Sequence, residues 1–211
     1  MSHCANCAPH SCAGGVLEHP PVDCPSCAAP LQEQAMSLLA EEENQRLART
    51  AAQVEAEGYG RLTRVEETIL FLKKMGCHKI GLAFCTGLWR EAHELTKILE
   101  YHGFEVCSAI CKNGCHPKRD LGLSDQETVR GCADEVMCNP IAQALVLNEA
   151  RTDFNLLLGL CVGHDTLILK YLEGPASVLA VKDRVTGHNP LAPIYQAQGY
   201  YRKKLYPPRE D

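Results

Sequence analysis

The residue type that stands out in this chain is cysteine, which occurs thirteen times among 211 residues. Cysteine thiolates bind zinc and iron–sulfur clusters or act as nucleophiles, and thiols can also pair as disulfides. The count is odd, the chain is larger than the usual disulfide scaffold, and "MSHCANCAPH" lacks the form of a secretory signal peptide. We therefore expect a reducing compartment and favour metal or cluster ligation. A disulfide framework would require export by a route that the sequence does not reveal.

Five of the cysteines lie in the first 30 residues, in "CANCAPHSC" and "DCPSC". A C-x2-C pair brings two thiolates onto one ion, and two such pairs complete a tetrahedron. The segment has no helical or strand periodicity, so ligation rather than burial has to supply its folding free energy. We expect zinc or a second iron–sulfur cluster at this segment. The candidates, five for four places, are Cys4, Cys7, Cys12, Cys24 and Cys27.

Four further cysteines stand at the ends of predicted elements. Cys85, Cys111 and Cys161 each end a short apolar run, and Cys138 stands just before "NPIAQ", where the proline suits the first turn of a helix. The carboxyl ends of parallel strands share one edge of a sheet, and ligands bind in the crevice outside that edge. We therefore expect these four thiols to converge on one site.

Four thiolates suit either zinc or an iron–sulfur cluster. Structural zinc usually takes its ligands from short paired spacings, whereas these cysteines are scattered over four elements, so we favour a [4Fe–4S] cluster. Cys115 in "CKNGCHP" is either an additional thiolate ligand or a loop residue. Packing in the interior is the simpler interpretation of Cys77 and Cys107.

Charged and imidazole side chains follow the third and fourth apolar runs. "CVGHD" supplies His164 and Asp165, and "KDRVTGHNP" supplies Lys182, Arg184 and His188; we take these five as candidate catalytic residues. A histidine at this edge would act as general acid or base, and the two cations would hold an anionic substrate. The structural alternative is that the aspartate caps a helix and that the second stretch is a surface loop.

Apolar patterning predicts the elements that position these residues. Residues 31–57 and 61–76 are expected to be helical, and beyond them short apolar runs alternate with helical patterns. Continuous apolar strands separated by helices indicate a mostly parallel sheet covered on both faces, which is a Rossmann-like three-layer α/β domain of unknown strand order. The expected strands are 79–85, 104–111, 154–161 and 176–183, with helices at 88–103, 139–151 and 165–174.

The same patterns divide the chain into three parts. Residues 1–30 form the Cys-rich metal-binding segment, residues 31–76 a helical segment that packs on the main domain, and residues 77–211 the Rossmann-like domain. The net charge of -5 argues against a nucleic-acid binder, and no apolar run approaches membrane-spanning length. We therefore expect a cytoplasmic protein whose partner is a redox protein or a small sulfur-containing or anionic substrate. The sequence does not indicate an oligomeric state.

Several motifs resemble a known family over nearly the whole chain. They are "CANC…SC", "TRVEETILF", "KIGLAFCTGL", "CNPIAQALVLN", "GLCVGHD" and "VKDRVTGHNP". The chain resembles the cysteine-rich family called domain of unknown function 1847, whose members are labelled predicted metal-binding proteins. The resemblance implies an α/β protein with two cysteine-rich sites, one using Cys4, Cys7, Cys12 and Cys24, the other Cys85, Cys111, Cys138 and Cys161.

The resemblance leaves both the ligand sets and the function open. Cys27 and Cys115 are additional to the family pattern, so either residue could replace an expected ligand. The family carries no established reaction. Three hypotheses remain: an iron–sulfur enzyme for redox or sulfur transfer of the desulfidase kind, a non-catalytic zinc-binding or metal-sensing protein, and an adaptor whose N-terminal module binds a protein partner.

Overall fold

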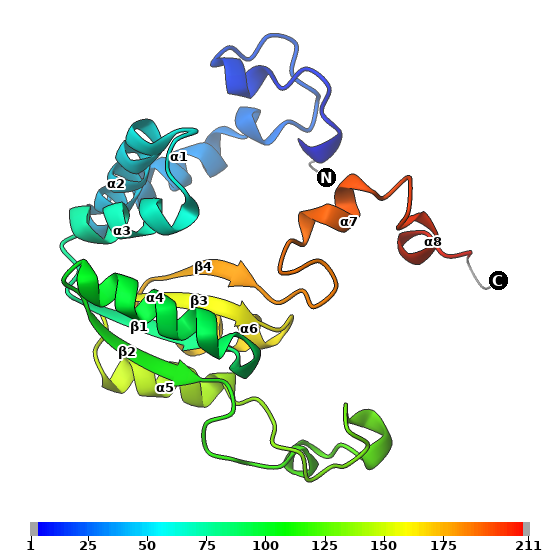
Figure 1. Cartoon of the computed structure of the whole chain (residues 1–211). Helices are drawn as coiled ribbons and strands as arrows, with labels where there is room; N and C mark the ends of the chain where they lie inside the picture. The colour runs from blue at the N-terminus through cyan, green and yellow to red at the C-terminus, as the bar shows by residue number, and fades with distance from the viewer. Residues whose placement is uncertain (1–3, 209–211) are drawn as a thin grey trace. The chain divides into compact units, whose positions relative to one another are not determined.

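The computed structural model of the protein describes residues 4–208 and divides into two compact units, one ending at Arg61 and the other beginning at Leu62 (Figure 1). We call them the N-terminal unit and the main unit. The helix expected at 61–76 belongs to the main unit, and the helical residues 31–57 belong to the N-terminal unit. Across residues 4–208, no helix has both the length and the apolar character needed to span a bilayer.

The main unit contains a four-stranded sheet in which all strands are parallel, so the predicted Rossmann-like α/β class is confirmed. The strands are β1 (Lys79–Phe84), β2 (Glu105–Ile110), β3 (Phe154–Leu160) and β4 (Ala176–Val181). Their order is β2-β1-β3-β4. The chain moves outward from β1 to β2 and then crosses back to β3, which puts the topological switch point between β1 and β3.

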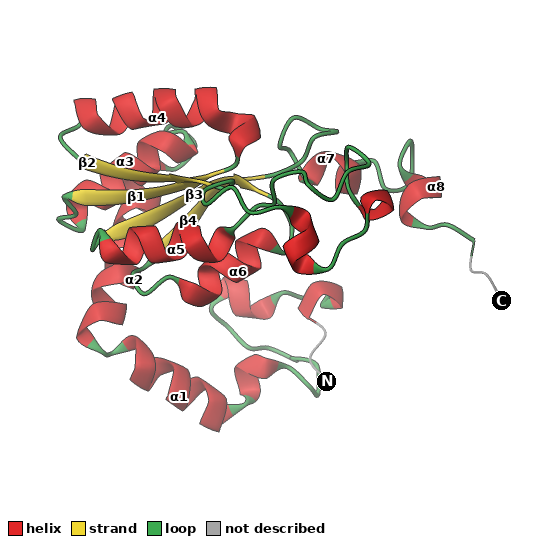
Figure 2. Cartoon of the chain, turned by 90° about the horizontal axis from the view of Figure 1, so that it is seen from below, coloured by secondary structure: helices red, strands yellow, loops and turns green. Residues whose placement is uncertain are grey.

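Helices cover both faces of this sheet (Figure 2). One face packs against α3 (Arg64–Lys74) and α4 (Trp89–Tyr101), and the other against α5 (Pro140–Glu149) and α6 (His164–Tyr171). Local sequence fixes two of the helix starts. Thr63 and Glu66 form a capping box before α3, and the Asn139 side chain accepts the Ala142 N–H at the start of α5.

A bulge at Gly159 changes the direction of side chains at the end of β3. Leu158 packs on the α3–α4 side of the sheet, and in a regular strand Leu160 would face the same way. Instead Leu160 packs on the α5–α6 side, because the pairing with β4 shifts register around Gly159, whose φ is +64°. The bulge therefore turns the Leu160 side chain to the α5–α6 side of the sheet, one residue before Cys161.

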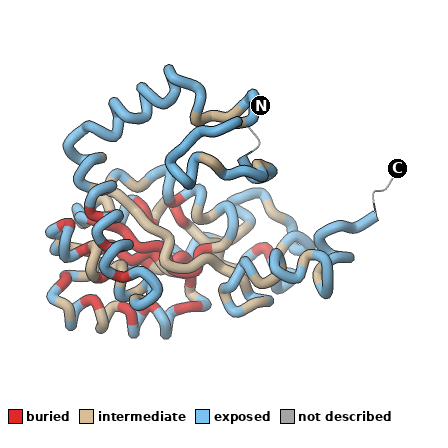
Figure 3. The backbone as a smooth tube through the Cα atoms, turned by 90° about the horizontal axis from the view of Figure 1, so that it is seen from above, coloured by how far each residue is buried: buried red, intermediate tan, exposed pale blue. Residues whose placement is uncertain are grey.

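The N-terminal unit has little core of its own. It comprises the short 3₁₀ turns η1 (Cys4–Asn6), η2 (Ser11–Gly14) and η3 (Pro25–Cys27), then α1 (Ala29–Leu39) and α2 (Glu42–Gly58). None of the described residues as far as Leu39 is buried, as the pale tube of Figure 3 shows. One continuous helix over 31–57 was wrong: the chain breaks at Ala40 and Glu41, where the Asn44 side chain donates to the Leu38 carbonyl.

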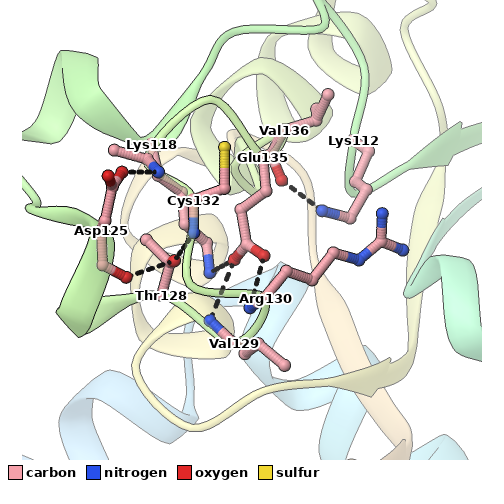
Figure 4. Close-up of polar contacts among 10 residues, drawn as sticks. Lys112, Lys118, Asp125, Thr128, Val129, Arg130, Cys132, Glu135 and Val136 are labelled. Atoms are coloured by element: carbon pink, nitrogen blue, oxygen red, sulfur yellow. Dashed lines mark hydrogen bonds and ion pairs between the residues drawn. The ribbon is translucent and has the colours of Figure 1, made fainter.

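Two segments had no predicted structure. Between β2 and α5 the chain makes a polar excursion that includes η5 (Lys118–Leu121) and η6 (Asp125–Glu127), and Figure 4 shows part of its hydrogen-bond network. After β4 it continues into the short helices α7 (Leu191–Tyr195) and α8 (Arg202–Leu205). A further 3₁₀ turn, η4 (Thr86–Leu88), joins β1 to α4.

Gly159→Ala should destabilise the main unit by about 2–4 kcal/mol. The new Cβ would lie 2.0 Å from Leu88 Cδ1, and a positive φ is unfavourable for alanine. The matched control is Gly131→Ala, at φ +66° with no atom within 4 Å of the added Cβ, which should cost only about 1–2 kcal/mol. The free energy of unfolding from denaturant titration tests this, and equal losses in the two variants would contradict it.

Candidate functional site

The four cysteines predicted to share a site all lie at the carboxyl edge of the sheet. Cys85, Cys111 and Cys161 directly follow β1, β2 and β3, and Cys138 stands two residues before α5. Cys85 and Cys161 therefore flank the switch point between β1 and β3, where doubly wound sheets bind their ligands. Cys85 and Cys111 are buried, with 6% and 2% of their surface exposed, whereas the other two are half-buried.

Three of these thiols lie close enough to shift one another's pKa. Cys111 interacts with Cys85 on one side and with Cys138 on the other. Cys161 lies within electrostatic range of Cys138, and its Sγ accepts a hydrogen bond of 3.3 Å from the Arg184 guanidinium. The fold thus gathers the four sulfurs in one region, although they come from four separate segments of the chain.

The backbone hydrogen bonding of the parallel sheet extends beyond the strand ends to Cys85 and Cys111. The Cys85 N–H donates to the Leu158 carbonyl at 3.1 Å, and the Cys111 N–H donates to the Phe84 carbonyl at 2.9 Å. On the other side of Cys111, its carbonyl accepts the Asn139 N–H at 2.7 Å, next to Cys138. These bonds hold the backbone around each thiol by the same register that builds the sheet.

Gln143 supports this edge, and its role was not predicted from the sequence. Its side chain on α5 is fully buried, and its Nε2 donates to the Phe84 carbonyl at 3.2 Å and the Ala109 carbonyl at 2.7 Å, joining the ends of β1 and β2. Within residues 4–208 its Oε1 has no hydrogen-bond partner. The signal in the sequence was Gln143 itself, the single amide side chain in the otherwise apolar stretch "PIAQALVL". A polar side chain buried in such a stretch needs hydrogen-bond partners, which points to a structural or functional role.

The thiols differ in how readily they ionise. Donation to Cys111, together with burial, raises the pKa of Cys85 to about 12. Donation to Cys138 raises the pKa of Cys111, although the Thr86 N–H at 3.3 Å from its Sγ acts in the opposite direction. The hydrogen bond from Cys111 and the nearby Lys112 ammonium lower the pKa of Cys138 to about 7. Of the three, Cys138 is therefore the thiol that ionises most readily near neutral pH.

Two of the predicted catalytic residues bring positive charge to this edge. Lys182 directly follows β4, and its N–H donates to the Leu160 carbonyl at 3.0 Å. A Cβ built on Gly87 would lie 3.3 Å from Lys182 Nζ and 3.9 Å from Cys85 Sγ, so the ammonium group lies near that thiol. Arg184 contacts Cys161 directly. The Lys182 charge acts to lower the pKa of Cys85, and both cations would attract an anion.

Two of the other three candidates have structural partners. Asp165 Oδ1 accepts the N–H groups of Gly163 and Thr166 at 3.0 and 2.8 Å from within the first turn of α6, whose N-cap is Gly163. His188 Nδ1 accepts the Asp183 N–H at 3.1 Å within the loop after β4. His164 is half-buried at the first position of α6. In the part of the chain that the structure describes, no hydrogen bond joins either histidine to a cysteine thiol.

The N-terminal cysteines are divided between one pocket and its surroundings. Cys4, Cys7 and Cys24 line a small pocket, and Cys27 hydrogen-bonds to Cys24, whereas Cys12 is exposed on η2. Cys115 is also exposed, in a left-handed turn after β2. Among residues 4–208, no three or more His, Cys, Asp and Glu side chains are arranged as they stand to hold a metal ion.

In metal-free protein, iodoacetamide should label Cys138 with an ionisation midpoint near pH 7, well before Cys85 and Cys111. Because only the thiolate reacts, a pKa below the ordinary 9.0 means faster labelling at neutral pH and loss of reactivity below about pH 6. Lys112→Met should move the midpoint upward, since it removes a stabilising charge. Peptide mass spectrometry resolves each site, and a Cys138 midpoint at pH 9 would contradict the assignment.

Comparison with known proteins places the chain in a family. Residues 24–179 match the family described as "Protein of unknown function (DUF1847)". "Uncharacterized protein MJ0455" of Methanocaldococcus jannaschii is 44% identical over 179 residues, which cover 85% of this chain and 90% of that relative. No solved structure matches the chain. The family match includes all four cysteines at the edge of the sheet, and on this evidence the protein belongs to the DUF1847 family.

Proposed function

We propose that the protein is an iron–sulfur protein that binds a [4Fe–4S] cluster through Cys85, Cys111, Cys138 and Cys161 and serves in redox chemistry. The observation that carries the proposal is the convergence of these four thiols on the carboxyl edge of the sheet, at the ends of three parallel strands and the start of α5. Four cysteine thiolates are the usual ligand set of such a cluster.

The donor set fits a cluster for a second reason. In a cluster each thiolate binds a different iron, so the four sulfurs surround a body larger than one ion, and ligands from four separate elements suit that arrangement. The thiolates would carry negative charge, and Lys112, Lys182 and Arg184 lie close enough to offset it. Backbone N–H groups such as that of Thr86 already point at sulfur.

The protein side of the chemistry follows from burial and charge. Cys85 and Cys111 are enclosed, which excludes water from one side of the site, while Cys138 and Cys161 leave the other side accessible to a partner. A bound cluster would supply one-electron transfer or an iron atom able to bind sulfur. Lys182 and Arg184 would orient a small anionic or sulfur-containing substrate or an acidic patch of a redox partner.

The proposal extends to the N-terminal cysteines, which we assign to a separate metal site with zinc as the expected ion. Local burial cannot hold this segment together, and ligation would. Free cysteines throughout the described chain are consistent with a reducing cytoplasm as the place of action.

Protein expressed and purified without oxygen should be brown and contain iron and acid-labile sulfide in equal amounts, with about four of each per main unit. Cys161→Ala should lose this iron and sulfide but keep the N-terminal metal. Cys107→Ala, which removes a thiol from inside β2, is the matched control and should keep both. Zinc without iron in the wild-type protein would refute the cluster and leave a zinc-binding protein.

Arg184→Ala should lower the reduction potential of the cluster while leaving its iron content unchanged. The substitution removes a positive charge and the hydrogen bond to Cys161 Sγ, and both favour the more negative, reduced state. Arg90→Ala, which removes an exposed cation stacked on Trp89, is the matched control. Spectroscopic redox titration measures the difference, and an unchanged potential in Arg184→Ala would remove this residue from the site.

A further inference from the structure

We infer that the N-terminal unit binds one tetrahedral zinc ion through two equivalent C-x2-C turns, Cys4–Cys7 and Cys24–Cys27, and that Cys12 is not a ligand. This assignment deepens the proposed N-terminal metal site. It differs from the ligand set that the family resemblance implies, which contains Cys12 instead of Cys27.

The two pairs are closed by the same kind of backbone hydrogen bond. The Cys7 N–H donates to the Cys4 carbonyl at 3.1 Å across η1, and the Cys27 N–H donates to the Cys24 carbonyl at 3.0 Å across η3. A tight turn of this kind places the first and fourth side chains on one side, which is the small bite that a C-x2-C pair offers to an ion. Each turn therefore supplies half of a tetrahedral site.

The two turns also meet at one place. Cys4 and Cys7 of the first turn and Cys24 of the second line the same pocket, and the Cys27 thiol hydrogen-bonds to Cys24. Sixteen residues, from Ala8 to Asp23, separate the pairs. C-x2-C, a spacer of 15–20 residues, and a second C-x2-C is a recognised spacing of zinc sites.

Cys12 belongs to a different local structure. It lies in η2, where the turn is closed by the Gly15 N–H on the Cys12 carbonyl at 3.3 Å and preceded by His10 in a left-handed conformation. Like Cys27, it is exposed and is not among the residues that line the pocket. The two differ in that Cys27 interacts with the pocket residue Cys24, whereas Cys12 stands outside both C-x2-C pairs. It has no cysteine at C-x2-C spacing with which it could form a third pair.

The sulfurs still have to turn toward a common point, because no three of those described are arranged to hold an ion as they stand. The four side chains are exposed or half-buried, so they can change rotamer at little cost, and the binding free energy of a structural zinc would offset the rearrangement. Binding would also fix the start of α1, since its Gln32 Nε2 donates to the Pro25 carbonyl of η3 at 2.9 Å.

The test compares Cys27→Ser with Cys12→Ser in the full-length protein, two identical exchanges fifteen residues apart, at exposed positions. We expect Cys12→Ser to bind one zinc per chain with wild-type affinity in a chelator competition, and Cys27→Ser to lose more than about 100-fold, beyond the cost of changing an outer-shell partner. With Co²⁺ as the probe, the sulfur-to-cobalt absorption should be unchanged in Cys12→Ser and reduced in Cys27→Ser.

The main unit reports separately on folding and on the proposed cluster. Iron and sulfide measured in the same samples should be equal in wild type and both variants, since the two sites lie in different units. Loss of zinc from Cys12→Ser with retention in Cys27→Ser would overturn the assignment, as would equal losses from both or a wild-type N-terminal unit that binds no zinc. None of these outcomes bears on the proposed cluster, which is tested separately by the iron and sulfide content.

Discussion

All strands of the main sheet run in one direction, and the candidate site depends on this single constraint. Parallel strands end at a common edge, so residues that follow β1, β2 and β3 meet even though Cys85 and Cys161 are far apart in the chain. The bulge at Gly159 completes the arrangement by turning the end of β3 toward α5 and α6. An antiparallel strand at any of these positions would have carried its cysteine to the opposite edge.

The polar groups at this edge of the sheet determine which of its cysteine thiols ionises. The pKa values of the buried Cys85 and Cys111 are raised and that of the half-buried Cys138 is lowered, so the thiol that ionises most readily is the more accessible one. Gln143 ties the same two strand ends together through their carbonyl groups. Burial disfavours charge, and the lysine and arginine side chains around the rim favour it, so ionisation is confined to the outer side of the site.

Most of the main unit could be predicted from sequence because its strands are continuous apolar runs and its helices have strong end signals. The strand "FNLLLGLC" and the proline at the first turn of α5 are examples. Strand order could not be read, since apolar runs do not encode which neighbours pair. The break at Ala40 was missed because neither alanine nor glutamate disfavours a helix, and the signal was a side-chain bond from Asn44.

The candidate site was predicted unevenly for a similar reason. Cysteine positions at strand ends identify the site, because topology alone brings strand ends together. The roles of Asp165 and His188 depend on side-chain hydrogen bonds within tight turns, which sequence spacing does not determine. Gln143 went unnoticed because its partners are main-chain carbonyls on other elements.

The excursion between Cys111 and Cys138 closes on itself. Lys118 and Glu135 form an ion pair that leaves only 20% and 10% of their side chains exposed, and Lys112 Nζ donates to the Val136 carbonyl (Figure 4). Pro117 forms an isolated antiparallel β-bridge with Val136. Glu135 also accepts the N–H groups of Val129 and Arg130. These contacts hold the two ends of the long loop together without a ligand. The Cys111 and Cys138 thiols are therefore already near each other when a ligand arrives. The entropy lost in closing the loop is part of the free energy of folding and does not weaken ligand binding.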